Sequence, residues 1–297
     1  MFFIHHIASS IQASNIIASV ANETIHTIER LFPEHLGQGP GEDNDIPTPD
    51  LLAEWNWCTV PARESGYIQS VDNAALLRVA RDRKTIVRME RSIGEFVVRD
   101  TALVSLALQD PLDQETIAAL QATFTVSRHR TVEQDAAFGI RQIVDVALKA
   151  LSPGINDTTT AMTCVDYLTT ILARVASRQI PSSHRFEEGE LRVIAKGPSF
   201  EGLLAESFDQ IRGSAKGDVA ILSRMLDACQ TLAGLTASLH RRQVLGEQVQ
   251  WIAELTERTV ESPHDRARID TRLARVREAL EAGPACESGR TQNREIP

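Results

Sequence analysis

The sequence predicts an α+β protein that is mainly α-helical, with a long N-terminal helix, a small β-barrel-like module and a helical bundle. Three observations support this class. Apolar residues recur at spacings of three and four through residues 2–32 and through most of residues 111–282, which is the helical period. Residues 59–108 instead carry short β-type segments separated by glycine turns. Residues 36–54 are rich in Gly, Pro and acidic side chains, as expected of a linker.

Composition limits the class of protein further. The chain has 297 residues, of which 42% are hydrophobic and 24% charged, so it can bury the core of one or two globular domains. The net charge of −9 argues against nucleic acid as a partner. Basic groups at residues 128–130 and 241–242 are interpreted as solvated faces or local ion pairs. No stretch reaches the ~18 apolar residues of a membrane span, and no signal peptide is visible.

The four cysteines predict neither a disulfide framework nor a metal site. Cys58, Cys164, Cys229 and Cys286 include no CxxC pair. Cys164 and Cys229 fall on apolar helical stripes and are expected to be small core residues. We therefore expect a reducing compartment, no metal and no cofactor.

The first helix, expected within residues 1–35, has an unusual surface. Its apolar and small residues form a heptad seam, and almost no charge precedes Glu23 on the opposite side. His5 and His6 are expected to be packed rather than metal-bound, because neighbours on a helix diverge by about 100°. These features predict a homo-oligomer whose interface or pore seam consists of Ile4, His5, Ile7, Ile11, Ser14, Ala18, Ala21, Ile25 and Ile28.

Residues 55–110 are expected to form the β module. The phrases ARESGYI and IGEFV place turns at Ser65-Gly66 and Ile93-Gly94, with a helical piece at residues 73–83 between them. The two halves resemble the barrel-sandwich hybrid, the fold of biotinyl and lipoyl carriers. No lysine follows Leu106 at the carrier position, so the module is interpreted as a scaffold or ligand-contacting unit.

A helical domain is expected over residues 111–262, a C-terminal helix over 263–282 and a disordered polar tail over 283–297. Within the helical domain, a β-like segment is predicted at residues 190–195. The helical part centres on residues 130–161, which read as two helices joined by the turn Ser152-Pro153-Gly154. Asn156 or Asp157 is placed to cap the second helix.

The polar side chains of residues 130–161 have two interpretations. One is a ligand pocket in which Arg130 and Arg141 meet an anion at the start of the second helix. The other is a buried hydrogen-bond network that fixes helix register, which we favour because caps and buried pairs are common. No nucleophile elbow, HExxH, Walker loop or dinucleotide fingerprint occurs, so no catalytic residue is assigned. The candidate residues are Arg130, Gln134, Asp135, Arg141, Gln142, Asp145, Asn156, Asp157, Thr158 and Thr160.

Five phrases carry a family resemblance: FIHHIASSIQ, LFPEHLG, SGYIQSVD, RTVEQDAAFGIRQIVDVALKALSPGINDTTTA and HRRQVL. They extend over most of residues 2–260 and resemble domain-of-unknown-function family 2254, a family of predicted bacterial membrane proteins. Its members look like N-terminal transmembrane helices followed by a region similar to this chain. Thr158 departs from the family, which usually has Pro there; the cap survives this change.

The resemblance implies that residues 1–35 continue from a transmembrane segment absent here. It also implies a location in the inner membrane of a bacterium, with the soluble region cytoplasmic. Three functions follow as hypotheses. The first is the assembly or regulatory domain of a membrane protein such as a channel or transporter. The alternatives are a membrane-tethered enzyme or anion- or ligand-binding domain that uses the polar hairpin 130–161, and a purely structural scaffold.

Overall fold

The computed structural model describes residues 2–32, 55–108 and 111–283, with the side chains of the first helix described from Gln12 onward. The predicted linker at 36–54, the tail beyond residue 283 and Cys286 lie outside these residues. The α+β, mainly helical class is confirmed, with 58% helix. Within the described residues, no helix is both long and apolar enough to cross a membrane.

The helices are α1 (Phe2–Leu31), α2 (Asn73–Asp82), α3 (Gln114–Ala122), α4 (Ala136–Ala150), α5 (Thr158–Ala176), α6 (Phe200–Ala215), α7 (Val219–Ala233), α8 (Leu239–Thr259) and α9 (Pro263–Ala282). The strands are β1 (Trp57–Pro61), β2 (Gly66–Val71), β3 (Val87–Met89), β4 (Phe96–Val97), β5 (Ala102–Ala107), β6 (Phe124–Ser127), β7 (His184–Glu187) and β8 (Glu190–Ile194). Asp or Ser side chains cap α2 to α9, which explains where these helices begin.

The predicted barrel is wrong, because the strands form two open sheets. One sheet has the order β1-β5-β3-β8-β7 and the other the order β4-β2-β6. Strand β8 comes from far along the chain and pairs parallel with β3, with Val87 opposite Val193. The β7–β8 hairpin therefore extends the first sheet at the edge where a barrel would have closed. The strands thus reach beyond residues 55–110, and the predicted domain division remains a prediction.

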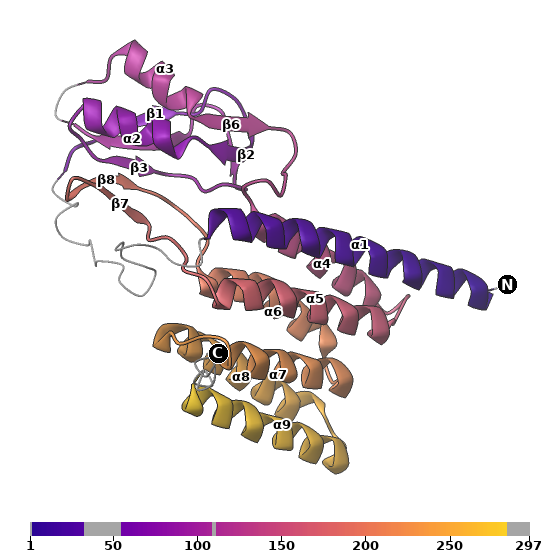
Figure 1. The fold of residues 1–297 in the computed structure, drawn as a ribbon. Coiled ribbons are helices and arrows are strands. Elements are labelled where there is room, and N and C mark those ends of the chain that lie inside the picture. The colour runs from indigo at the N-terminus through magenta and orange to yellow at the C-terminus, as the bar shows by residue number, and fades with distance from the viewer. Residues whose placement is uncertain (1, 33–54, 109–110, 284–297) are drawn as a thin grey trace, which may run out of the picture.

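The helices form layers below the sheets (Figure 1). Helix α1 packs beside α4 and α5 in the helical layers nearest the sheets, and α7, α8 and α9 lie farthest from the sheets. One hydrophobic core runs through all the helical layers, from Ile17 to Val276. A second core lies between the sheets, α2 and α3, and it includes Val60, Ile68, Leu76, Val104 and Leu120.

The second half of α1 packs against α4 and α5 of its own chain. Ile17, Ala21, Thr24 and Ile28 are each no more than 1% exposed. The backbones approach closely because Gly139 of α4 lies against Thr24, where a Cβ atom would overlap the threonine hydroxyl. The contact therefore depends on the absence of a side chain at residue 139.

This packing changes the meaning of the predicted oligomer seam. Ala21 and Ile28 are buried and Ile25 is half-buried, all against the core of the same chain. Ser14 and Ala18 are partly exposed, and the side chains of Ile4, His5, Ile7 and Ile11 lie outside the described ones. Self-association remains a prediction, and it would need the outer face or the first half of α1.

Two buried arginines hold the C-terminal ends of helices. Arg241 of α8 is 5% exposed and donates to the carbonyls of Val175, Ala176 and Arg178 at 3.0, 3.3 and 2.9 Å. Arg178 donates to the carbonyls of Glu29 and Phe32 at 3.3 and 2.6 Å. These carbonyls lie at or just beyond the C-terminal ends of α5 and α1, where the positive guanidinium suits the negative end of the helix dipole. The interpretation of Arg241 as a solvated residue is wrong.

Replacing Arg241 by Ala should lower the free energy of unfolding by about 2–4 kcal/mol, because each buried carbonyl left without a donor costs roughly 1–3 kcal/mol. Urea denaturation measures this loss. His240→Ala, an exposed change on the same helix, serves as the control and should cost less than about 0.5 kcal/mol. Equal losses in the two variants would contradict the capping role of Arg241.

Candidate functional site

A half-open pocket of about 430 Å³ lies where the sheets meet the helical layers. Its wall combines the end of α1, the first turns of α4 and α6, the segment after β3 and the segment after β8. Its lining includes Leu31, Phe32, Met89, Ile93, Gln134, Asp135, Arg185, Lys196, Ser199 and Glu206. Two predicted site residues, Gln134 and Asp135, therefore line a real cavity.

Arg130 and Asp135 form an ion pair beside this pocket. Nε and Nη2 of Arg130 lie 2.9 and 2.7 Å from Oδ2 of Asp135, whose side chain is 5% exposed. The other carboxylate oxygen accepts from the backbone N–H of Phe138 at 3.0 Å and so caps α4. The guanidinium of Arg130 also lies over the Phe138 ring, 4.9 Å from its centroid. Every polar atom of the Asp135 carboxylate thus has a partner that fixes the start of α4.

The sheet rests directly on this ion pair through Gly94. Gly94 has a φ of +84°, and a Cβ atom there would lie 2.7 Å from Nη2 of Arg130 and closer still to Asp135. Beside it, Gln134 accepts from the N–H of Val71 at 3.2 Å. The start of the α4 segment therefore ties the sheets to the helices. The sequence marks Gly94 only as a turn; nothing local indicates its long-range contact.

Arg141, Gln142 and Asp145 lie along the exposed side of α4. Arg141 pairs with Asp145, and its Nη1 lies 3.5 Å from Oε1 of Glu206 on α6. The hydrogen bond to Asp145 raises the pKa of Arg141. Because the Asp145 side chain is 59% exposed, the contacts of Arg141 form a surface network. The favoured interpretation of a buried network is therefore wrong for Arg141 and Asp145.

Asn156, Asp157, Thr158 and Thr160 lie at the other end of α4. Asp157 caps α5 by accepting from the N–H and the hydroxyl of Thr160 at 3.0 and 2.6 Å. Thr158 donates to Asp218, the cap of α7, at 3.0 Å. The 15 residues of α4 separate this turn from Arg130 by about 22 Å. The predicted anion site between Arg130, Arg141 and this helix start does not form.

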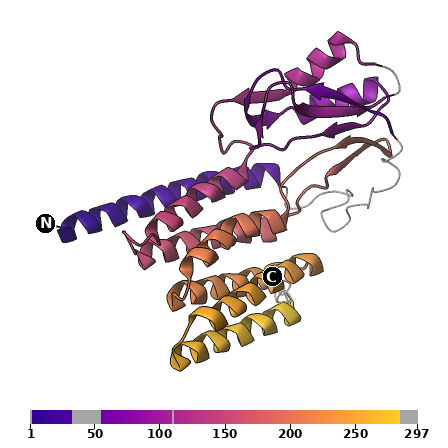
Figure 2. The ribbon, with the colours of Figure 1, turned by 180° about the vertical axis from the view of Figure 1, so that it is seen from behind.

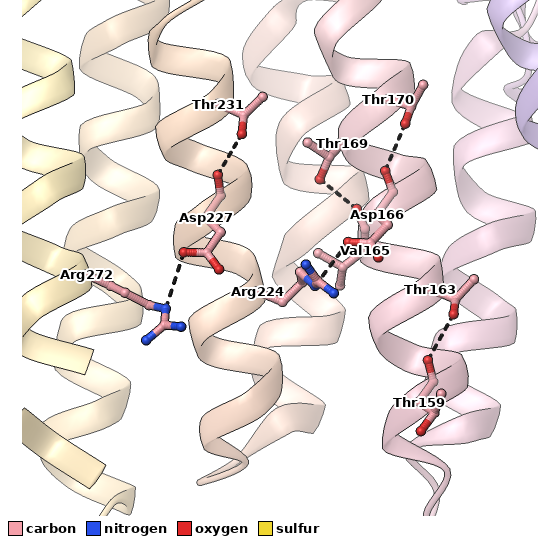
Figure 3. Close-up of polar contacts among 10 residues, drawn as sticks. All are labelled: Thr159, Thr163, Val165, Asp166, Thr169, Thr170, Arg224, Asp227, Thr231 and Arg272. Atoms are coloured by element: carbon pink, nitrogen blue, oxygen red, sulfur yellow. Dashed lines mark hydrogen bonds and ion pairs between the residues drawn. The ribbon is translucent and has the colours of Figure 1, made fainter. Parts of the chain in front are cut away.

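A further polar region connects α5, α7 and α9 (Figure 3). Asp166 pairs with Arg224 at 3.1 Å, and Asp227 pairs with Arg272 at 3.3 Å. Burial raises the pKa of Asp166, and Arg224 opposes that shift. Threonine hydroxyls on this face donate to carbonyls one turn earlier in their own helices, at Thr163, Thr169, Thr170 and Thr231. The two ion pairs join α5 to α7 and α7 to α9, while the threonine hydroxyls bond within their own helices.

The two cysteines predicted to be core residues are core residues. Cys164 and Cys229 are fully buried in the helical layers. Burial raises the pKa of each thiol to about 12, so both are protonated at neutral pH. A thiol in that state is a poor nucleophile.

Comparison with known proteins gives a family and distant relatives. A family model described as "Predicted membrane protein (DUF2254)" matches residues 1–231. Uncharacterised proteins of Mycobacterium tuberculosis and Mycobacterium bovis are each 28% identical over 292 residues, which cover 95% of this chain and 54% of the relative. The chain thus spans about half the length of the curated relatives it matches. No solved structure matches it.

Gly94→Ala should lower the free energy of unfolding by about 3 kcal/mol. The positive φ costs roughly 1–2 kcal/mol for a residue with a Cβ atom, and the overlap with the ion pair adds roughly 1–3 kcal/mol. Gly189→Ala is the matched control, because Gly189 has a φ of +81° but no atom within 4 Å of the added Cβ. If both variants lose the same free energy of unfolding, the contact of residue 94 with the ion pair contributes nothing to stability.

Arg141→Ala should lower the free energy of unfolding by less than about 1 kcal/mol, because exposed ion pairs contribute little. Asp135→Asn should cost more, because Asp135 is buried and leaves Arg130 without its partner. Chemical denaturation of both variants provides the comparison. A larger loss for Arg141→Ala would mean that the α4–α6 network is structural.

Proposed function

We propose that this chain, which belongs to the DUF2254 family of predicted membrane proteins, is the assembly and regulatory region of a membrane protein. In this proposal, α1 connects a membrane part to the sheets and helices described above. The greater length of the curated relatives leaves room for such a part. The buried free thiols of Cys164 and Cys229 agree with a reducing, cytoplasmic location.

The observation that carries the proposal is the contrast between the two ends of α1. Its C-terminal end is held by Arg178 and contributes Leu31 and Phe32 to the pocket. Its N-terminal end extends past α4 and α5 (Figures 1 and 2). On the outer face, Ile16 is 51% exposed, an apolar side chain available to a partner.

A helix with these contacts suits the transmission of a ligand signal. Its 30 residues span about 45 Å as one rigid element. A ligand that contacts Leu31 and Phe32 would favour one position of the helix end, and the rigid backbone would carry that shift along its length. The ligand can shift the equilibrium only by its difference in affinity for the two positions.

A ligand-binding domain is favoured over a membrane-tethered enzyme. The pocket at the start of the 130–161 hairpin has the size of a small-molecule site. The groups nearest to catalytic chemistry, Arg130 and Asp135, pair with each other, and Asp135 also caps α4. Binding followed by a change in α1 thus accounts for the pocket without requiring a reactive group.

Ile16→Asp should weaken self-association of the purified chain at least about tenfold, because it places a charge in an interface that would otherwise bury an apolar side chain. Multi-angle light scattering over a concentration series measures the association. Asn22→Asp is the control, because it adds the same charge at another exposed position of α1. A parent chain that stays monomeric at high micromolar concentration would overturn assembly through α1. An unchanged oligomer in the Ile16 variant would point to another surface.

A further inference from the structure

We propose that the pocket between the sheets and the helices binds a small organic anion, whose charged group is held by Arg185 and Lys196. The inference deepens the proposed function, because such an anion would be the ligand that acts on α1. It concerns residues outside the 130–161 hairpin.

The carboxylates that line the pocket have oppositely charged partners, whereas the cations that line it have none in the described part of the chain. Both lining carboxylates contact arginines: Asp135 pairs with Arg130 at 2.7 Å, and Glu206 lies 3.5 Å from Arg141, which Asp145 also contacts. Neither lining cation has a carboxylate partner within the part of the chain that the structure describes. Among the described residues, Lys196 donates to the carbonyl of Glu90, at 2.9 Å. The charge left without a counter-ion in this pocket is therefore positive.

The two cations come from one hairpin and the residues directly after it. Arg185 lies on β7, opposite Val193 of β8, and Lys196 follows β8 by two residues. The backbone holds this end of the hairpin together, since the N–H of Ala195 donates to the carbonyl of Ser183 at 2.7 Å. Both side chains belong to the wall of the same cavity. A guanidinium and an ammonium there supply charge-assisted donors for a carboxylate, phosphate or sulfonate group.

The start of α6 adds to this positive field. Ser199 caps the helix and accepts from the N–H of Gly202 at 3.0 Å, and both residues line the pocket. The 16 residues of α6 place the positive end of the helix dipole at the wall. The field of the helix and the two cations thus act in the same direction.

The rest of the wall determines the body of the ligand. Leu31, Phe32, Met89, Ile93 and Ile180 form an apolar side. At about 430 Å³ the cavity can hold a molecule of more than a few atoms. A bare inorganic ion would leave that apolar side unused, so an anion with an apolar or aromatic portion is the better fit.

The test uses 8-anilino-1-naphthalenesulfonate, an aromatic anion, and the neutral N-phenyl-1-naphthylamine of similar shape. Fluorescence titration should give one saturable sulfonate site in the parent chain. Arg185→Gln/Lys196→Gln should weaken sulfonate binding at least about tenfold, because two charge-assisted donors are lost. Affinity for the neutral probe should stay unchanged. Arg63→Gln/Lys149→Gln removes the same charge outside the pocket and should leave both affinities unchanged.

Both altered side chains are exposed, so the double variant should keep the parent's thermal unfolding midpoint. Arg185→Lys/Lys196→Arg keeps both charges and should retain sulfonate binding. Three results would overturn the inference: no saturable sulfonate site, equal sulfonate affinity in parent and Gln variant, or equal loss of both probes. If the chain does not self-associate through Ile16, the result of the sulfonate titration is unaffected. The assembly proposal and the anion-binding proposal can therefore fail independently.

Discussion

The buried ion pair between Arg130 and Asp135 is the contact on which the junction of the molecule depends. It fixes the first turn of α4, and Gly94 of the β segment rests directly on it. A buried pair adds little net stability, because desolvation offsets much of the attraction, but the loss of one partner is costly. The pair therefore acts mainly as a positional constraint. It determines where the sheets sit on the helices and, through them, the shape of the pocket.

The second constraint is the bonding of backbone carbonyls at the C-terminal ends of helices. Arginine side chains from distant segments donate hydrogen bonds to these carbonyls. Arg241 bonds the end of α5, and Arg178, just beyond α5, bonds the end of α1. The two contacts link α8 to α5 and α5 to α1, although α1 and α8 are far apart in the chain. Because Phe32 is both an acceptor in this chain of contacts and part of the pocket wall, the end of α1 is well placed to respond to a ligand.

Many polar groups among the described residues are committed to structure, which is why the pocket stands out. Thr163, Thr169, Thr170 and Thr231 bond carbonyls of their own helices, and the aspartates between α5, α7 and α9 bond arginines. Arg185 and Lys196 differ, because they line a cavity without a carboxylate partner among the described residues. Charge balance thus singles out a site that the sequence motifs did not indicate.

The sequence by itself determined the mainly helical α+β class, the turn after α4, a cap at Asn156 or Asp157 and the core positions of Cys164 and Cys229. These depend on side-chain period and on contacts within a few residues, which are local properties.

Tertiary structure decided the rest. Short strands separated by glycine turns are equally compatible with a barrel and with open sheets; the parallel pairing of β3 with β8 selected the open form. An apolar seam on α1 specifies a buried face but not its partner, which for Ala21, Ile25 and Ile28 is the core of the same chain. The polar residues of 130–161 share one stretch of sequence, yet the length of α4 holds them apart, while Gly94, Arg185 and Lys196 reach the junction only through long-range packing.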